Sequence, residues 1–154
     1  MQGVSSNLSL KELYEIDDHL WLEQTIKLLK ANHLEELDLE NLIEELDNLG
    51  RRDKAKVSLL EQILRHLLLL QFWTEEFQYK SGHWKAEIRN FRNQLKRNLT
   101  TNLYQFLEIE LASIYYDALG YVIDKTEGKL DNLPQSCIYT LEQLLDINYL
   151  PENV

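Results

Sequence analysis

A carboxylate, an imidazole, an indole and a guanidinium on segments with helical spacing could meet in one site. They are Glu45, His66, Trp84 and Arg89. A carboxylate or imidazole out of water is costly unless it is paired, so Glu45 and His66 are each expected to have a partner. Arg89 is predicted to reach Glu45 across a helix interface, with Trp84 stacked nearby. An ion pair that fixes helix register is the favoured interpretation, and a ligand-binding or active site is the alternative.

Basic residues form a second candidate site, for anions. Lys85, Arg89, Arg92 and Lys96 are spaced four, three and four residues apart. This spacing predicts a ridge along one helix, beside its apolar stripe. Together with Arg97, the ridge is a candidate for binding a phosphate or another polyanion.

The charge pattern limits which partners fit this ridge. Lys and Arg minus Asp and Glu gives 3 − 12 = −9 for residues 1–49, 11 − 5 = +6 for 50–102 and 2 − 9 = −7 for 103–154. Basic central helices packed beside acidic outer ones would account for the pattern without any ligand. The net charge of −10 opposes nonspecific binding of nucleic acid or anionic membrane. Neither is expected as a partner.

Known catalytic and metal-binding motifs do not occur in the sequence. None of the four histidines follows a glutamate at the di-iron spacing, and one cysteine excludes the usual structural zinc sets within a single chain. Cys137 is expected to act as a small hydrophobic residue rather than a nucleophile. Phosphate loops and nucleophile elbows need glycines beside a strand, which this sequence lacks. We expect no metal and no cofactor, and the sequence favours a noncatalytic role.

Helices are the elements predicted to position these residues. The chain has 5 Gly and 2 Pro, and its many Leu, Glu, Lys and Gln residues enter helices at little entropic cost. Apolar residues recur at three- and four-residue spacings. The predicted helices cover residues 10–32, 38–49, 53–79, a segment from Trp84 to about Leu99, 103–125 and a short segment after Thr140. The fold class is therefore all-α, a single-domain bundle of about five to six helices.

Particular residues are predicted to begin the helices. Ser9 with Glu12, and Thr140 with Gln143, have the spacing of a capping box, and Asp38 is the expected cap of the second helix.

Glycines are predicted to separate the central helices. The apolar face of the second helix comprises Leu39, Leu42, Ile43, Leu46 and Leu49. Gly50 is expected to end this helix in the left-handed conformation. Ser81 and Gly82 are expected to form the turn between the third and fourth helices.

Length and composition indicate one globular domain over residues 1–154, of which 1–9 are expected to be a flexible tail. The hydrophobic fraction is 44% and the charged fraction 27%, which is typical of a globular protein. The first residues do not have the pattern of a secretory signal, and the longest aliphatic run is far too short to span a membrane. A cytoplasmic protein is expected, without a membrane partner.

Several segments together resemble the bacterial family of domains of unknown function numbered twenty-nine, which is well represented in cyanobacteria. The matching pieces are Tyr14 to Asp17 with Trp21, Leu37 to Arg51, His66 to Leu68, Trp84 with Ile88, Arg89 and Arg92, Pro134, Cys137, and Thr140 to Asp146. The resemblance covers Tyr14 to Pro151 and implies an all-helical domain without an established activity. The chain departs from the family pattern at Leu69, Leu70, Thr74 and Ile138.

Three hypotheses of function follow. The leading one is a noncatalytic protein that acts through contacts, either as a homo-oligomer or with another intracellular protein. The second is a small-ligand-binding protein or enzyme that uses Glu45, His66, Trp84 and Arg89. The third is a polyanion or nucleic-acid binder that uses the basic ridge.

Overall fold

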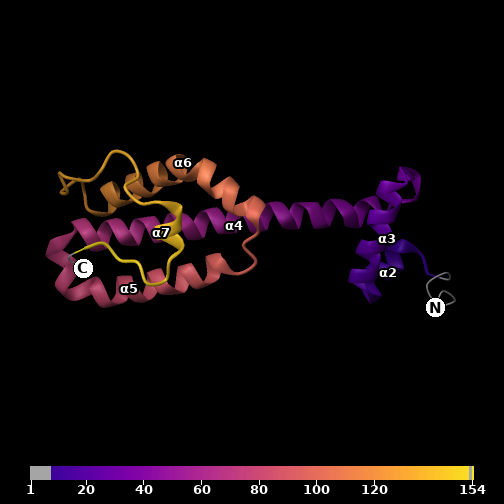
Figure 1. The fold of residues 1–154 in the computed structure, drawn as a ribbon, viewed down its shortest axis with the longest axis horizontal. Helices are drawn as coiled ribbons and strands as arrows, with labels where there is room; N and C mark the ends of the chain where they lie inside the picture. Colours follow the sequence, from indigo (N-terminus) through magenta and orange to yellow (C-terminus); the bar gives the residue numbers. More distant parts are fainter. Residues whose placement is uncertain (1–7, 153) are drawn as a thin grey trace. The chain divides into compact units, whose positions relative to one another are not determined.

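The computed structural model describes residues 8–152 and 154. Within these residues every regular element is a helix (Figure 1), which confirms the predicted all-α class. The sequence predicts one domain, and the chain divides into two compact units, of which the first ends at Arg52 and the second begins at Asp53. Most of the expected flexible tail, residues 1–7, lies outside the described residues.

The first unit contains α2 (Leu10–Ile16), α3 (Asp18–Lys30), the 3-10 helix η1 (Leu34–Glu36) and the beginning of α4 (Leu39–Phe72). The single helix predicted over 10–32 is interrupted at Asp17, whose non-helical backbone (φ −148, ψ 87) ends α2. The side chain of Asp17 then accepts a 3.1 Å hydrogen bond from the Leu20 amide and caps α3. The capping box of Ser9 and Glu12 at the start of α2 is as predicted.

The prediction that Gly50 ends a helix is wrong. Helix α4 continues from Leu39 to Phe72, and the boundary between the two units falls within it. Gly50 does not have a positive φ, and no atom outside the helix backbone lies within 4 Å of the place where a Cβ would stand. One glycine inside a helix costs about 1 kcal/mol relative to alanine, which the strong helix formers on both sides offset.

The turn between the two central helices is at Trp73, not at Ser81 and Gly82 as predicted. Trp73 has φ −93 and ψ 69, and α5 (Thr74–Lys96) begins directly after it and passes through both residues without a break. Glu75 and Glu76 lie in the first turn of α5. Acidic residues there favour a helix N-terminus because they interact with its free amides and dipole.

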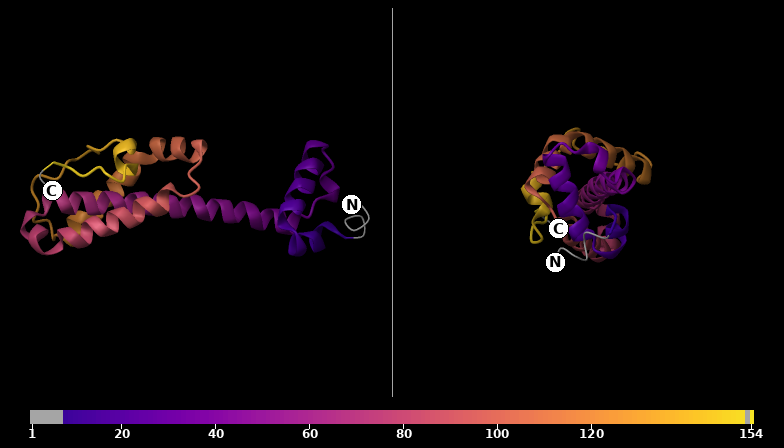
Figure 2. Two further views of the ribbon diagram at one scale, coloured as in Figure 1. Left: turned by 60° about the horizontal axis from the view of Figure 1, so that its bottom comes forward. Right: turned by 90° about the vertical axis from the view of Figure 1, so that its right-hand side faces the viewer.

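The second unit contains the rest of α4, then α5, α6 (Thr101–Lys125) and the short α7 (Leu141–Leu145). Figures 1 and 2 show α5 and α6 alongside the part of α4 that belongs to this unit. Thr100 caps α6, and Thr140 and Gln143 form the predicted capping box of α7. The fully buried core of this unit includes Leu60, Ile63, Leu64, Leu67, Leu68, Leu70, Leu95, Leu107, Ala118, Val122 and Leu144.

In the part of the chain that the structure describes, none of the helices combines the length and apolar character needed to cross a bilayer.

Candidate functional site

The predicted polar cluster is distributed over both units. Glu45 belongs to the first unit, whereas His66, Trp84 and Arg89 belong to the second. Glu45 does have a partner, but the donor is the Tyr14 hydroxyl, 2.6 Å from Glu45 Oε2. Arg89 is exposed and has no ion-pair partner among the described residues.

His66 is held in one tautomer by the backbone of its own helix. Its Nδ1 atom lies 2.7 Å from the carbonyl oxygen of Gln62. Because a carbonyl only accepts, Nδ1 carries the hydrogen and Nε2 is left as an acceptor in the neutral ring. Burial lowers the pKa of His66 below its ordinary value. The ring is therefore neutral near pH 7 and cannot supply positive charge.

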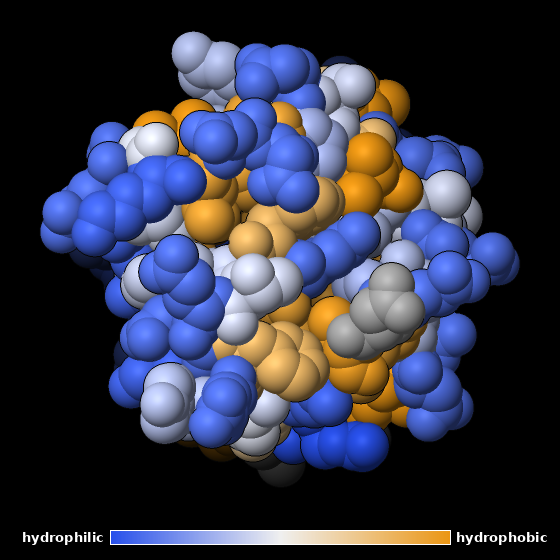
Figure 3. All heavy atoms as spheres, turned by 90° about the vertical axis from the view of Figure 1, so that its left-hand side faces the viewer, coloured by the Kyte–Doolittle hydropathy of each residue, from blue (hydrophilic) through white to orange (hydrophobic). Residues whose placement is uncertain are grey.

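Two of the predicted residues, His66 and Trp84, line one pocket of the second unit. Its volume is about 280 Å³, and its other lining residues are Leu69, Trp73, Glu76, Lys80, His83, Tyr121 and Lys125. The rings of Trp73 and Trp84 are stacked with centroids 6.1 Å apart. Figure 3 views the end of this unit where α4 turns into α5, and hydrophobic side chains reach the surface there between hydrophilic ones. Arg89 does not line this pocket.

The basic ridge of α5 is interrupted because Arg92 points inward. Arg92 is 1% exposed, and its Nε, Nη1 and Nη2 atoms donate to the carbonyls of Leu144, Tyr149 and Gln143. Burial lowers the pKa of Arg92. The reason for its position is helical phase, since it stands four residues after Ile88 and three before Leu95, both buried.

The remaining ridge residues are not equivalent. Lys85 is partly buried and its Nζ lies 5.8 Å from the ring centroid of Phe77. Arg89, Lys96 and Arg97 are exposed. The guanidinium of Arg92 is engaged by backbone, so an anion at this surface would meet only the exposed members.

The first unit carries an open apolar groove. Of the four residues in the predicted polar cluster, only Glu45 lines this groove. Its volume is about 390 Å³. It is lined by Tyr14, Asp18, His19, Trp21, Leu22, Leu42, Glu45, Leu46, Leu49 and Arg52. The sequence signal for the groove is the apolar face of the predicted second helix, from which Leu42, Leu46 and Leu49 line it. Leu46 and Leu49 on that face are 58% and 51% exposed.

Most aliphatic side chains of the first unit face solvent. Those exposed are Ile16, Leu22, Ile26, Leu29, Leu34, Leu39, Ile43, Leu46 and Leu49. Among the described residues of this unit, the buried hydrophobic side chains are Leu13 and Trp21. A unit this small with so little buried apolar surface gains little from its own core. Its apolar side chains are therefore largely left in contact with solvent.

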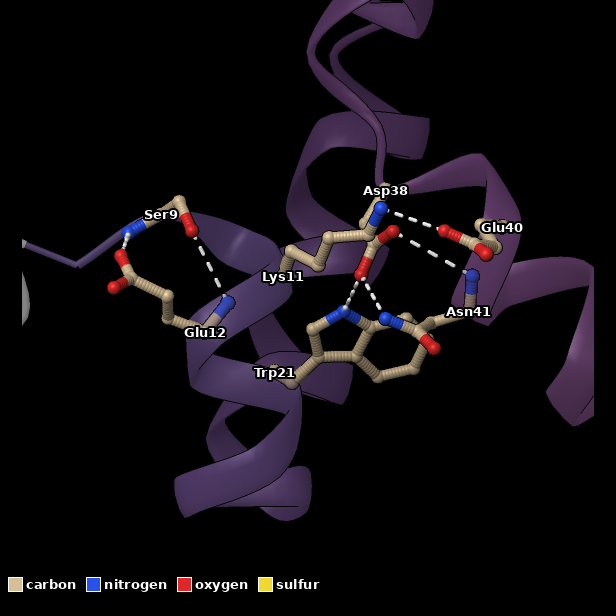
Figure 4. Close-up of polar contacts among 7 residues, drawn as sticks. All are labelled: Ser9, Lys11, Glu12, Trp21, Asp38, Glu40 and Asn41. Carbon is tan, nitrogen blue, oxygen red and sulfur yellow. Dashed lines mark hydrogen bonds and ion pairs between the residues drawn. The ribbon is translucent and has the colours of Figure 1, made fainter.

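Polar contacts also hold the helices of this unit together (Figure 4). The indole Nε1 of Trp21 donates a 3.2 Å hydrogen bond to Asp38, which also accepts a 2.6 Å bond from the Asn41 side chain. Lys11 of α2 forms a 2.6 Å ion pair with Glu40 of α4. These contacts join α2 and α3 to the beginning of α4, and Trp21 also lines the groove.

No group of three or more His, Cys, Asp and Glu side chains suited to a metal ion occurs within residues 8–152 and 154.

A model of the family described as a domain of unknown function, DUF29, matches residues 13–150. The match covers nearly the stretch over which the sequence resembles family twenty-nine, and it includes residues of both units. No curated protein and no solved structure matches the chain.

Proposed function

The chain belongs to the DUF29 family, a family of unknown function, and we propose that it is a protein-interaction module. Its first unit binds an amphipathic helix of another protein. Apolar residues of that helix enter the groove, and Lys or Arg residues flank them.

The exposed apolar surface of the first unit carries this proposal. Leu22, Leu46 and Leu49 line the groove and are 46%, 58% and 51% exposed. Full burial of a leucine contributes about 1.5–3 kcal/mol, so roughly half of that remains to be gained at each position. Association itself costs about 4–15 kcal/mol. The three leucines together supply about 2–5 kcal/mol, which does not exceed this cost, so charged residues of the partner must contribute to the affinity as well.

Charge decides the kind of partner. Lys and Arg minus Asp and Glu gives 5 − 12 = −7 for residues 8–52. Asp18 and Glu45 line the groove itself, and Arg52 is the only Lys or Arg among the described residues that line it. A second copy would bring the same negative charge to the interface, and like charges at an interface are unfavourable. A basic partner gains both attraction and faster association.

The basic helix of the chain itself does not have the surface for this role. The apolar residues Trp84, Ile88 and Leu95 of α5 are buried in the core of their own unit. They would have to leave that core before they could enter a groove on a second copy. The occupant is therefore a helix with a free apolar face, which is the helix-in-groove mode of recognition.

A titration of the full chain with labelled peptides tests the proposal. The probe is a fluorescein-labelled Leu/Lys peptide patterned as an amphipathic helix, followed by fluorescence anisotropy. Its matched control has the same leucines and Glu in place of Lys. We expect saturable binding of the basic peptide and at least about tenfold weaker binding of the acidic one. Equal affinity for the two peptides would contradict the assigned partner chemistry, and binding of neither would contradict the docking function.

Variants locate the binding surface. Leu46→Gln with Leu49→Gln removes apolar surface from the groove and keeps residues that favour helix. Ile109→Gln is the matched control, because Ile109 is 78% exposed on α6 of the second unit. We expect the double variant to lose about tenfold or more in affinity and the control to lose none. Light scattering after size exclusion completes the test, since a stable homodimer would favour a second copy as the occupant.

A further inference from the structure

We infer that the pocket between α4, α5 and α6 of the second unit is a binding site for a small aromatic carboxylate. The inference rests on residues of this unit alone and is independent of the groove in the first unit. It assigns a ligand class to a pocket that already contains His66 and Trp84, two of the residues that the sequence singled out.

The inner part of the pocket suits an aromatic ring. Leu69 and Trp84 are 2% and 4% exposed, and Trp73 stacks on Trp84 with an angle of 20° between the ring planes. Aromatic surfaces attract a further ring by offset or edge contacts. A volume of about 280 Å³ is at the lower limit for ligand pockets. It accommodates one ring with a short substituent rather than a nucleotide or a cofactor.

The outer part of the pocket suits an anion. Lys80 of α5 and Lys125 of α6 are both exposed there, and neither forms an ion pair with a described residue. Glu76 also lines the pocket, so the two ammonium groups exceed the carboxylates by one. A ligand carboxylate between the lysines would form charge-assisted hydrogen bonds, which are about twice as strong as neutral ones.

Two other basic side chains near the pocket, Arg65 and His66, already have partners and are not free to bind a ligand carboxylate. Arg65 lies over the ring of Tyr121, with its Cζ atom 3.8 Å from the centroid, and it is also paired with Glu61. His66 donates through Nδ1 to its own helix. Among the described residues that line the pocket, Lys80 and Lys125 are therefore the cations free to contact a ligand.

Benzoate is the probe, and NMR of the full-length protein is the measurement. The indole N–H signals of Trp73 and Trp84 report the pocket, and that of Trp21 reports the first unit. We expect benzoate to shift the first two and to leave Trp21 unchanged. Benzylamine keeps the ring and reverses the charge, and acetate keeps the charge without the ring. Each of these is expected to bind at least about tenfold more weakly than benzoate.

Lysine variants complete the test. Lys80→Gln with Lys125→Gln removes both charges from exposed positions, and we expect benzoate affinity to fall at least about tenfold. Lys54→Gln is the control, because Lys54 is exposed, lies outside the pocket and is expected to leave the affinity unchanged. The ligand-free indole signals show whether the double variant keeps its fold. The inference is overturned if benzoate shifts neither indole, if benzylamine or acetate binds as tightly, or if a folded double variant keeps full affinity.

Discussion

The hydroxyl of Tyr14 donates a 2.6 Å hydrogen bond to Glu45 Oε2 and so joins α2 to α4 within the first unit. Both residues line the apolar groove. The hydrogen bond to Glu45, followed by burial, raises the pKa of Tyr14 to about 12. The same contact thus joins two residues of the groove lining and raises the pKa of Tyr14, which can be measured.

Replacing the acceptor should return Tyr14 to ordinary titration. In Glu45→Gln the charged acceptor is lost, so we expect the pKa of Tyr14 to fall toward 10. The tyrosine Cζ chemical shift, followed by NMR up to about pH 11, measures this change. The contact stabilises the fold fully below pH 10, the unfolded value, and this contribution is lost as pH rises toward 12. An unchanged Tyr14 titration in the variant would mean that the hydrogen bond does not form.

Arg92 should be required for stability, whereas Arg89 on the same helix should not be. Arg92→Met leaves the carbonyls of Leu144, Tyr149 and Gln143 without their donor. We expect a loss of about 3 kcal/mol in the free energy of unfolding. Arg89→Met changes an exposed position, and we expect a change within about 0.5 kcal/mol. Urea unfolding of both variants measures these changes. Equal losses in the free energy of unfolding would contradict the structural role of the buried Arg92.

Alanine at Gly50 or Gly82 should stabilise the protein. Both glycines lie inside helices, have no positive φ and have free space where a Cβ would stand. Each substitution is expected to raise the free energy of unfolding by about 0.5–1 kcal/mol. If Gly50 instead ended a helix in the left-handed conformation, alanine would destabilise the protein by a similar amount. Thermal unfolding therefore distinguishes the continuous α4 from the two helices that the sequence suggested.

The pH dependence of stability should contain a contribution from His66. Burial lowers its folded pKa below the unfolded value of 6.5, so the unfolded chain binds the proton more readily. This contribution is fully present above pH 6.5 and is lost as pH falls toward the folded pKa. We expect wild-type protein to lose more stability than His66→Gln between about pH 7.5 and 5.5. If the urea midpoints of the two proteins changed by the same amount over this pH range, the burial of the imidazole would be contradicted.

Local signals in the sequence predicted much of the fold. The capping boxes of Ser9 with Glu12 and of Thr140 with Gln143 involve residues three apart, so spacing alone finds them. Gly50 misled the prediction because one glycine costs only about 1 kcal/mol within a helix, and flanking residues outweigh it. Glu75 and Glu76, directly after Thr74, are typical of a helix N-terminus and indicate the true start of α5.

The candidate sites could be predicted only in part. The apolar face with Leu46 and Leu49 was visible, but a pattern does not reveal whether the chain itself covers the face. The partner of Glu45 is Tyr14, thirty-one residues away, and such a pairing depends on how α2 and α4 come together. The inward position of Arg92 was available from its phase between Ile88 and Leu95. The sequence thus placed residues on helix faces but did not identify their contacts.

The most direct test of the docking function is the indole N–H signal of Trp21 in a nitrogen-15 spectrum of the full chain. Trp21 lines the groove and its Nε1 donates to Asp38, so an occupant of the groove must change its surroundings. On addition of the basic Leu/Lys peptide, we expect the Trp21 signal to shift saturably while those of Trp73 and Trp84 stay in place. A titration that leaves Trp21 unmoved, or that shifts only Trp73 and Trp84, would contradict the account.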